Sequence, residues 1–482
     1  MLRRNKEIFL IIGIFTLIRL IVVPHFGLGV DEAHYVLYAK YLDWSYLDHP
    51  PLVGWVHAIF FYTFGTNEFL ARLPAVLIFA ATSYCAYIFM LQISKSVRLS
   101  ALAVLALNCS FMFNVLGLML LPDSLLLLFV FLLIFITEKI SREKKLINFI
   151  YLGILLGLMG LAKYTAILLV PPLIAYFLLN KRYDIVFSKE MALAALIALF
   201  LITPVIIWNI EHDFSSFRYQ GARVFGSFTK SLKYFIVSLA AQFGTYSPLL
   251  FLAAFYGFIK FIRSQEDYLR LSVLFGGTII GFFLLTSFSQ RALPHWPAIF
   301  YLLFIPLGCY ALLIAKEKWK KNYFYFAVGL SLFLLLFAYT ELTGKFIKYP
   351  EYKSPFRDIY GFQEITQKAD ETLKNDEESA KKAIAVTNWT MGSRTMYYSM
   401  PYDNKVFVLD FRKDQFDIWE KKSPVGMDLL IINTHSNKFD IEKRLKCERV
   451  EIAAELEIEL NGSKVDTVKY VWCRNYGGFN IE

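Results

Sequence analysis

The chain has 482 residues, of which 57% are hydrophobic and 17% aromatic, and its mean hydropathy is +0.47. An ordinary soluble domain has a smaller apolar share, so this composition excludes a soluble globular protein and indicates a polytopic membrane protein. The formal net charge is +10. Most of this charge lies in loops between hydrophobic runs, so it indicates membrane topology and gives no argument for nucleic-acid binding.

Hydrophobic runs follow one another through the first 340 residues and give about eleven candidate spans of the length that a bilayer requires. In chain order they lie at residues 8–24, 69–93, 100–120, 124–137, 147–161, 165–179, 191–209, 235–259, 271–288, 296–315 and 323–341.

The basic residues of the loops predict the orientation of these spans. They fall in alternate loops, for example at Lys144 and Lys145 and again at Lys320 and Lys321. The positive-inside rule places these loops and the N-terminus in the cytoplasm. We therefore expect a multi-pass protein of the inner membrane whose first loop and C-terminal region face outward, into the periplasm.

The first outward loop combines acidic and aromatic residues. Asp31-Glu32 and Asp48-His49 lie among tyrosines and tryptophans between residues 31 and 55. Aromatic side chains are typical of the membrane interface, where ionisable groups usually serve chemistry or binding. Asp31 is a candidate catalytic residue, and Glu32, Asp48 and His49 are candidate substrate-binding residues. The alternative is a solvated loop whose carboxylates have no chemical role.

A second carboxylate, Asp123, lies in the apolar sequence LMLLPDSLLLLF. It belongs to the same predicted membrane face as Asp31, so it is the second candidate catalytic residue. Two such carboxylates could divide the acceptance of a proton and the orientation of a nucleophile or metal. Alternatively, Asp123 only caps the following helix by accepting hydrogen bonds from its first free amides.

Several cations also lie on the outward face, where the positive-inside rule predicts few. Such an accumulation suggests an anionic ligand, most simply a phosphate held by Arg and Lys. We assign Lys163, Arg218 and Arg291 to donor phosphate binding; Arg223, Lys230 and Lys233 share this face. The alternative is pairing with anionic lipid headgroups.

Two further histidines, His212 and His295, are candidate substrate-binding residues. Asp48, His49 and His212 are weak candidates for metal ligands, because no tight His/Asp spacing defines a site. Before Lys163, three glycines at positions 153, 157 and 160 form a small-residue face that predicts close helix packing.

Beyond residue 344 the chain becomes polar. Short apolar runs at 383–386, 405–410, 427–432 and 468–472 predict strands of a compact α/β domain. We therefore divide the chain into a transmembrane domain, residues 1–344, and an exported soluble domain, residues 345–482. Cys447 and Cys473 are the two cysteines of this region, and an exported location would let them pair.

Several motifs in one order resemble a known family. The chain carries Asp-Glu-Ala-His-Tyr and Asp-His-Pro-Pro, then GTNEFLARLPAVL, LPDSLL, GLAKYT, WNIEHDFSSFRYQ and RALPHWPAIFYL. Together these motifs resemble the bacterial members of glycosyltransferase family 39, relatives of the protein O-mannosyltransferases and the lipid A aminoarabinose transferase. The resemblance covers roughly residues 1–340, and it does not extend to the sequence of the C-terminal region.

This resemblance implies a GT-C fold with juxtamembrane helices in the first outer loop. It implies a membrane glycosyltransferase that moves a sugar from a polyprenyl-phosphate donor to an envelope lipid, glycan or protein, with inversion at the anomeric carbon. In the family's pattern Asp31 and Asp123 match the outer-loop carboxylates, and Lys163 matches a basic residue that contacts the lipid phosphate. The aminoarabinose transferases have an acid-lysine pair where this chain has Asp48-His49, which leaves the acceptor open.

Other functions remain open at this stage. A lipid or solute transporter would place ionisable groups near the bilayer midplane and often shows inverted halves. In this sequence the unusual charges lie at the outer ends of the spans, and no second half resembles the first. A noncatalytic envelope sensor would carry its function in the C-terminal region. No cofactor is assigned, and a divalent metal is left open; the sugar and the polyprenol length are not specified by the sequence.

Overall fold

The computed structural model describes residues 6–225 and 231–480, apart from the side chains of residues 223–225. The chain forms two compact units. The first comprises Met1–Ile21, Asp43–Val56 and Phe69–Ala338. The second comprises Val22–Leu42, His57–Glu68 and Tyr339–Glu482, so it joins two short segments from the start of the chain with the C-terminal region.

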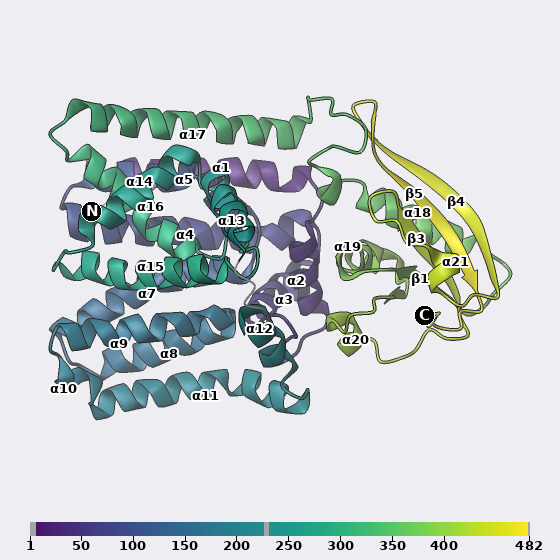
Figure 1. The fold of residues 1–482 in the computed structure, drawn as a ribbon, viewed down its shortest axis with the longest axis horizontal. Coiled ribbons are helices and arrows are strands. Elements are labelled where there is room, and N and C mark those ends of the chain that lie inside the picture. Colours follow the sequence, from purple (N-terminus) through teal and green to yellow (C-terminus); the bar gives the residue numbers. More distant parts are fainter. Residues whose placement is uncertain (1–5, 226–230, 481–482) are drawn as a thin grey trace. The chain divides into compact units, whose positions relative to one another are not determined.

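The first unit is helical, and its long helices run roughly along one direction (Figure 1). Its helices are α1 (Lys6–Val22), the start of α3 (Leu52–Phe64), α4 (Glu68–Ser94), α5 (Val97–Cys109), α6 (Phe111–Leu118), α7 (Pro122–Arg142), α8 (Leu146–Ala162), η3 (Tyr164–Leu169), α9 (Val170–Leu179), α10 (Tyr183–Val186), α11 (Lys189–Glu211), α12 (Ser215–Phe225), α13 (Leu232–Thr245), α14 (Pro248–Phe261), α15 (Asp267–Thr286), α16 (Ala298–Leu313) and most of α17 (Lys318–Gly344).

Six helices of the described residues are long and apolar enough to cross a membrane: α1, α4, α7, α11, α15 and α17. Two bent pairs, α5 with α6 and α13 with α14, raise this number to eight if each pair is one span. Shorter apolar helices fill the other predicted runs. The expectation of a polytopic helical membrane protein is confirmed, whereas the count of eleven spans stays a prediction.

The two bent pairs are broken where the sequence predicts continuous runs. The α5/α6 pair bends by 75° and the α13/α14 pair by 106°. In the second pair Pro248 lacks an N–H for the helix ladder, and Ser247 before it has a φ of 66°. The breaks bond to each other, since the Ser110 hydroxyl donates to the Tyr246 carbonyl at 3.2 Å. This satisfies backbone groups that would otherwise lie unpaired in an apolar environment.

Helix α8 packs closely on α11 through its glycines. A Cβ added at Gly153 would lie 2.6 Å from the Ala194 carbonyl oxygen, and one at Gly157 would lie 2.6 Å from the Leu201 Cβ. Only a residue without a side chain fits at such an approach. The predicted role of these glycines in helix packing is confirmed.

The second unit holds a five-stranded sheet of order β2-β1-β3-β5-β4. Its strands are β1 (Lys382–Val386), β2 (Val406–Val408), β3 (Asp428–Thr434), β4 (Arg449–Leu460) and β5 (Ser463–Arg474). Its helices are α2 (Val30–Lys40), the rest of α3, α18 (Phe362–Lys374), α19 (Trp389–Ser399), α20 (Gln415–Trp419) and α21 (Ile441–Arg444), with short turns η2 (Val23–His25), η4 (Arg357–Ile359) and η5 (Met400–Tyr402).

The sheet is mixed. Strand β1 pairs in parallel with β2 and β3, with Ile384 opposite Val406 and Leu430. Strand β5 pairs antiparallel with β3 and with the edge strand β4. An apolar core that includes Ala383, Leu429 and Val471 lies on one face. The predicted α/β character of the C-terminal region is therefore confirmed, although β4 was not predicted.

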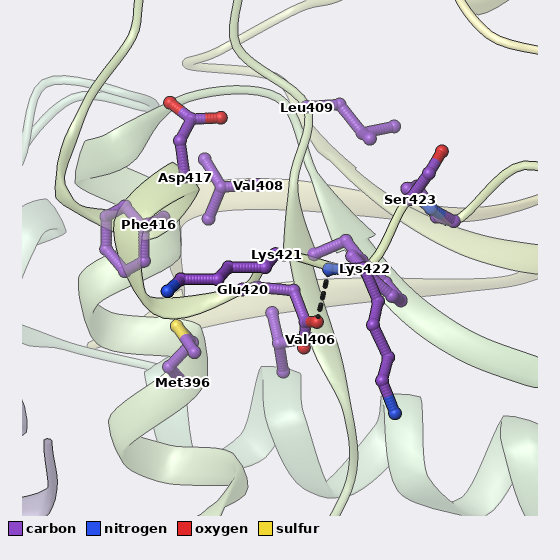
Figure 2. A pocket seen from close by; sticks show the side chains of 12 residues that line it. Met396, Val406, Val408, Leu409, Phe416, Asp417, Glu420, Lys421, Lys422 and Ser423 are labelled. Atoms are coloured by element: carbon purple, nitrogen blue, oxygen red, sulfur yellow. Dashed lines mark hydrogen bonds between the residues drawn. The ribbon is translucent and has the colours of Figure 1, made fainter.

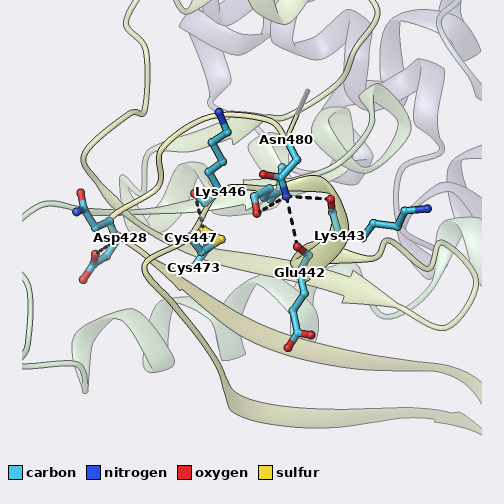
Figure 3. Close-up of a disulfide and its surroundings, with 9 residues drawn as sticks. Asp428, Glu442, Lys443, Lys446, Cys447, Cys473 and Asn480 are labelled. Atoms are coloured by element: carbon cyan, nitrogen blue, oxygen red, sulfur yellow. Dashed lines mark hydrogen bonds between the residues drawn. A yellow bond between two sulfur atoms is a disulfide. The ribbon is translucent and has the colours of Figure 1, made fainter. Parts of the chain in front are cut away.

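A disulfide ties the loop before β4 to β5. Cys447 and Cys473 are bonded, with their Cα atoms 5.1 Å apart, a separation that suits this bond (Figure 3). Nearby, the Asn480 side chain donates to the carbonyls of Lys443 and Leu445 and so fastens the end of the chain to α21. The pairing that the sequence left open is thus made in the structure.

Candidate active site

A buried ion pair lies at the start of α7 in the first unit. Pro122 occupies the first turn of α7, where its missing N–H costs nothing, and Asp123 follows it. Lys163 lies where α8 ends and η3 begins, with an extended backbone that interrupts the helix. Its Nζ lies 2.6 Å from Asp123 Oδ1, and both residues are 5% exposed. The structure therefore brings together two residues that are 40 positions apart in the sequence.

Two histidines adjoin this pair. His295 Nε2 lies 3.9 Å from Asp123 Oδ2, and the His295 side chain is 20% exposed. The His49 ring is close enough to Asp123 to act on its charge. Asp123 therefore has a lysine at hydrogen-bond distance and the His295 imidazole at its edge, groups that can bind an anion and hold or move a proton.

Two stacked tyrosines, Tyr246 at the break between α13 and α14 and Tyr301 on α16, lie on one side of the Asp123 cluster. Tyr246 lies at the break between α13 and α14, close enough for the charge of Asp123 to act on it. Its hydroxyl donates to the Pro294 carbonyl at 3.1 Å, which holds the loop that carries His295. Its ring stacks on Tyr301, with centroids 3.8 Å apart, and the Tyr301 hydroxyl donates to Gln242. The break in the helix thus serves to position a polar wall.

The alternative in which Asp123 only caps α7 is wrong. Leu121 occupies the cap position, and its N–H donates to the Ser124 hydroxyl at 3.3 Å. Ser124 therefore supplies the local hydrogen bonds at this helix start. The Asp123 carboxylate instead accepts its charged hydrogen bond from Lys163.

Residues 43–56 of the first loop are fastened to α11 and α12. Asp43 Oδ2 accepts a hydrogen bond from the indole of Trp208 at 2.8 Å. The Gln220 amide donates to the Asp48 carbonyl at 2.6 Å. His212 stacks on the Trp208 ring, with centroids 4.0 Å apart, and its Nδ1 lies 2.8 Å from the Trp208 carbonyl oxygen. In these contacts His212 supports the loop, and its predicted role in substrate binding stays a prediction.

The two arginines assigned to phosphate binding are exposed, whereas Lys163 is buried. Arg218 on α12 is exposed, and Arg291 is exposed with its guanidinium 5.9 Å from the ring centroid of Tyr234. The contacts described for residues 6–225 and 231–480 do not join either arginine to Asp123. The side chain of Arg223 and the whole of Lys230 lie outside the described residues.

The first acidic pair belongs to the second unit. Glu32 is 3% exposed, and its Oε2 accepts a hydrogen bond from the Gly29 N–H at 2.9 Å, so it caps the start of α2. Asp31, one residue earlier, is only partly buried. Part of the expected aromatic surface is internal, since Tyr35 and Tyr38 are buried, whereas Trp44 is exposed. Glu32 thus has a structural role, and Asp31 remains the accessible carboxylate of this helix turn.

Within the described part of the chain, no three His, Cys, Asp or Glu side chains are gathered in a set that could hold a metal ion. The weak metal candidates Asp48, His49 and His212 do not form such a set. The divalent metal stays a prediction, and the reaction proposed for this protein does not require one.

A cavity of ≈ 220 Å³ lies in the second unit, between β2, α19 and residues 416–424 (Figure 2). Its two carboxylates, Glu420 and Asp417, are engaged with their neighbours. Glu420 accepts a hydrogen bond from the Lys422 N–H at 3.0 Å and pairs with Lys405. Asp417 accepts one from the Asp414 N–H at 2.7 Å. This cavity lacks the convergent, buried charges of the Asp123 cluster and is not taken as the active site.

Sequence reasoning missed Asp43, Trp208, Gln242, Tyr246 and Tyr301. None of them stands out by local composition, because tyrosine and tryptophan are abundant throughout this chain, with 29 and 8 copies. Pro248 after a serine was the available signal for the break that places Tyr246.

The chain is similar to known proteins in sequence and in fold. Residues 48–208, which include Asp123 and Lys163, match the family model described as dolichyl-phosphate-mannose-protein mannosyltransferase. A curated relative, the lipid A galacturonosyltransferase RgtD of Rhizobium johnstonii, is 24% identical over 306 residues, 61% of this chain. The chain spans about 62% of that relative's length.

The solved structure of ArnT from Cupriavidus metallidurans in the apo state superposes with a TM-score of 0.63 at 12% identity, over 96% of this chain and 97% of that one. The structure of the same protein bound to undecaprenyl phosphate superposes with a TM-score of 0.60 at 12% identity, over 97% and 98%. The chain has the fold of the GT-C glycosyltransferases. The predicted GT-C fold class is therefore confirmed, and the match over residues 48–208 confirms the predicted family resemblance.

The buried pair yields a prediction about stability. Removing one partner leaves the other charge buried and uncompensated, so Asp123→Asn or Lys163→Met alone should cost about 3–5 kcal/mol of the free energy of unfolding. The double variant with both changes should recover most of this loss, because no buried charge remains. SDS titration of the full chain in mixed micelles measures these values.

The exposed pair Arg182–Asp184, with Nε and Oδ1 2.9 Å apart, supplies the control. Asp184→Asn should leave stability unchanged, since exposed pairs contribute little. Additive losses in the double variant of Asp123 and Lys163 would contradict the pairing.

Proposed function

We propose that this protein is an integral-membrane glycosyltransferase that transfers a sugar from a polyprenyl-phosphate-linked donor to a lipid or glycan acceptor of the cell envelope. The observation that carries this proposal is the Asp123–Lys163 pair with His295 at its edge. The similarity to a lipid A galacturonosyltransferase and to a mannosyltransferase family model supports the reaction type. The fold shared with a protein that binds undecaprenyl phosphate supports the class of donor.

Lys163 is the proposed contact to the donor phosphate. An ammonium group has three N–H donors, and Asp123 takes one of them at 2.6 Å, so the others can reach phosphate oxygens. Asp123 holds the ammonium in place inside an apolar unit. His295, which is partly exposed, can add a second donor at the same anion when it is protonated. Arg218 and Arg291 are proposed as outer cations that attract the anionic head group.

The chemistry follows from the groups present. The acceptor oxygen forms a bond to the anomeric carbon while the bond from that carbon to the phosphate oxygen breaks, and the electron pair leaves with the polyprenyl phosphate. Negative charge therefore grows on the phosphate, where Lys163 stabilises it. A single displacement of this kind inverts the configuration of the anomeric carbon.

Asp31 is the proposed base for a hydroxyl acceptor. A hydroxyl must lose its proton as it attacks, and the Asp31 carboxylate is the accessible acidic group of the first turn of α2. An acceptor phosphate would arrive already ionised and would need no base. Asp48 and His49 are proposed to contact the acceptor, where they would contribute to its choice.

We also propose that Asp31, Asp123 and Lys163 face the outside of the inner membrane, as the positive-inside rule predicts. A donor anchored by its polyprenyl chain stays in the lipid while its sugar reaches this face. The disulfide in the second unit supports this orientation, because such bonds persist in oxidising compartments.

The phosphate contact is tested with Lys163→Ala. Loss of a charge-assisted hydrogen bond worth about 1.5–3 kcal/mol should weaken binding of undecaprenyl phosphate about tenfold to a hundredfold. Binding is measured by calorimetry on the full chain in nanodiscs, at a temperature at which the variant is folded. The control is Lys321→Ala, which removes an exposed lysine of the same unit from a loop predicted to lie on the opposite, cytoplasmic side. Equal affinity in Lys163→Ala and wild type would rule out the contact.

The role of the base is tested with Asp31→Asn, which keeps the size of the side chain but removes its basicity. Transfer from a panel of undecaprenyl-phosphate-linked hexose, hexosamine and uronic acid to lipid A should fall at least about a hundredfold, the scale of general base catalysis. Binding of undecaprenyl phosphate should be unchanged. Glu32→Gln serves as comparison, because it alters the helix cap and not the accessible carboxylate. A transfer rate equal to wild type in Asp31→Asn would show that Asp31 is not the base.

Orientation is tested by the redox state of Cys447 and Cys473 in the native protein and by a reporter fused after Lys345. The expected result is a disulfide resistant to alkylation and a reporter active only outside the cytoplasm. Two freely alkylated thiols, together with a cytoplasmic reporter signal, would reverse the proposed topology.

A further inference from the structure

Helix α19 of the C-terminal region holds the segment that leads into α2. The Leu28 N–H donates to the Tyr398 hydroxyl at 2.8 Å, although the two residues are 370 positions apart. One residue earlier, the Gly27 N–H donates to the Ile359 carbonyl at 2.9 Å. Tyr398 is 8% exposed. Burial and the nearby Glu68 carboxylate raise the pKa of its phenol, so it remains protonated at neutral pH.

The approach is close enough to require glycine at position 27. A Cβ added there would lie 2.8 Å from the Tyr398 hydroxyl oxygen and 2.9 Å from the Ile359 carbonyl oxygen. Real Cβ atoms are not found so near to other heavy atoms. The backbone before α2 is therefore fixed by two hydrogen bonds and by the absence of a side chain.

A second contact fixes the body of α2. His34 is 4% exposed, and its Nδ1 lies 3.2 Å from the Ser393 hydroxyl of α19. Its ring is surrounded by aromatic rings of α2, α19 and α20 with centroids 5.1 to 6.0 Å away: Tyr35, Tyr38, Trp389, Phe416 and Trp419. A helix clamped at its entry and at its second turn has little freedom to rotate or slide.

Asp31 lies between these two contacts. Leu28 precedes it by three residues and His34 follows by three, and both are buried, whereas Asp31 remains partly exposed. The contacts thus fix the helix on either side of Asp31 while leaving its carboxylate accessible.

We propose that Tyr398 and Ser393 are positioning residues of the transfer reaction: α19 sets the placement of Asp31 by binding the entry and the second turn of α2. This inference rests on the proposed function, in which Asp31 is the base. It assigns to the C-terminal region a part in catalysis, which the sequence left without a role.

The test is Tyr398→Phe in the full chain, assayed in nanodiscs with the same panel of undecaprenyl-phosphate-linked sugars and lipid A. The ring remains, but the Leu28 N–H loses its acceptor. A misplacement of about one ångström can cost about a hundredfold in rate, so kcat should fall about tenfold to a hundredfold while the KM for the donor is unchanged. Hydrogen exchange of the peptide covering residues 27–32 should become faster.

Tyr397→Phe is the matched control. It removes the neighbouring hydroxyl of α19, which accepts a hydrogen bond from the Thr66 hydroxyl at 3.3 Å. Its kcat should equal that of wild type. Ser393→Ala, which removes the bond to His34, should lower kcat in the same way as Tyr398→Phe, so the inference can be tested even if one variant folds poorly.

The outcomes separate this inference from the function on which it rests. Wild-type kcat in both Tyr398→Phe and Ser393→Ala, with Asp31→Asn inactive, overturns the inference alone. An equal loss in Tyr397→Phe, or a loss confined to KM, overturns it as well. If Asp31→Asn transfers sugar as fast as wild type, the role of Asp31 fails and the inference fails with it.

Discussion

The cost of burying charge in an apolar helical unit governs the arrangement of the candidate site. Asp123 and Lys163 are each 5% exposed, and neither charge could remain there without the other. The need to join them explains why α8 ends at Lys163 and turns through an extended residue. The same constraint favours the polar wall of Tyr246 and the histidine loop that it holds. The cost of burying these two charges thus underlies both the chemistry of the site and the interruption of the helix at Lys163.

Much of the fold could be predicted from the sequence because its signals are local. Hydrophobic runs of about 20 residues indicate helices in a membrane protein, and four short apolar runs indicated four of the five strands. Strand β4 is not a continuous apolar run like the four predicted strands: its sequence, RVEIAAELEIEL, alternates apolar residues with glutamates at the edge of the sheet, a period-two pattern that also indicates a strand. The break at Ser110 was missed because its backbone is held by hydrogen bonds to a distant helix, whereas the break at Ser247 had a local signal in Pro248.

The site was predictable in its residue types and not in its pairings. Asp123 and Lys163 stand out as charges in apolar surroundings, which is a local signal. That they form a pair, and that Glu32 is used as a helix cap, depends on three-dimensional contacts. Trp208 and Tyr246 carry no sequence signal of their own, because aromatic residues in this chain also fill the core and face lipid.

The bond between Leu28 and Tyr398 also constrains the order in which the protein can mature. Chains are made from the N-terminus, so α2 leaves the ribosome some 370 residues before the helix that covers it. During that interval His34 on the buried face of α2 lacks the rings of Trp389, Phe416 and Trp419 that surround it in the finished protein. The final packing around Asp31 must therefore wait until the whole membrane unit has been synthesised.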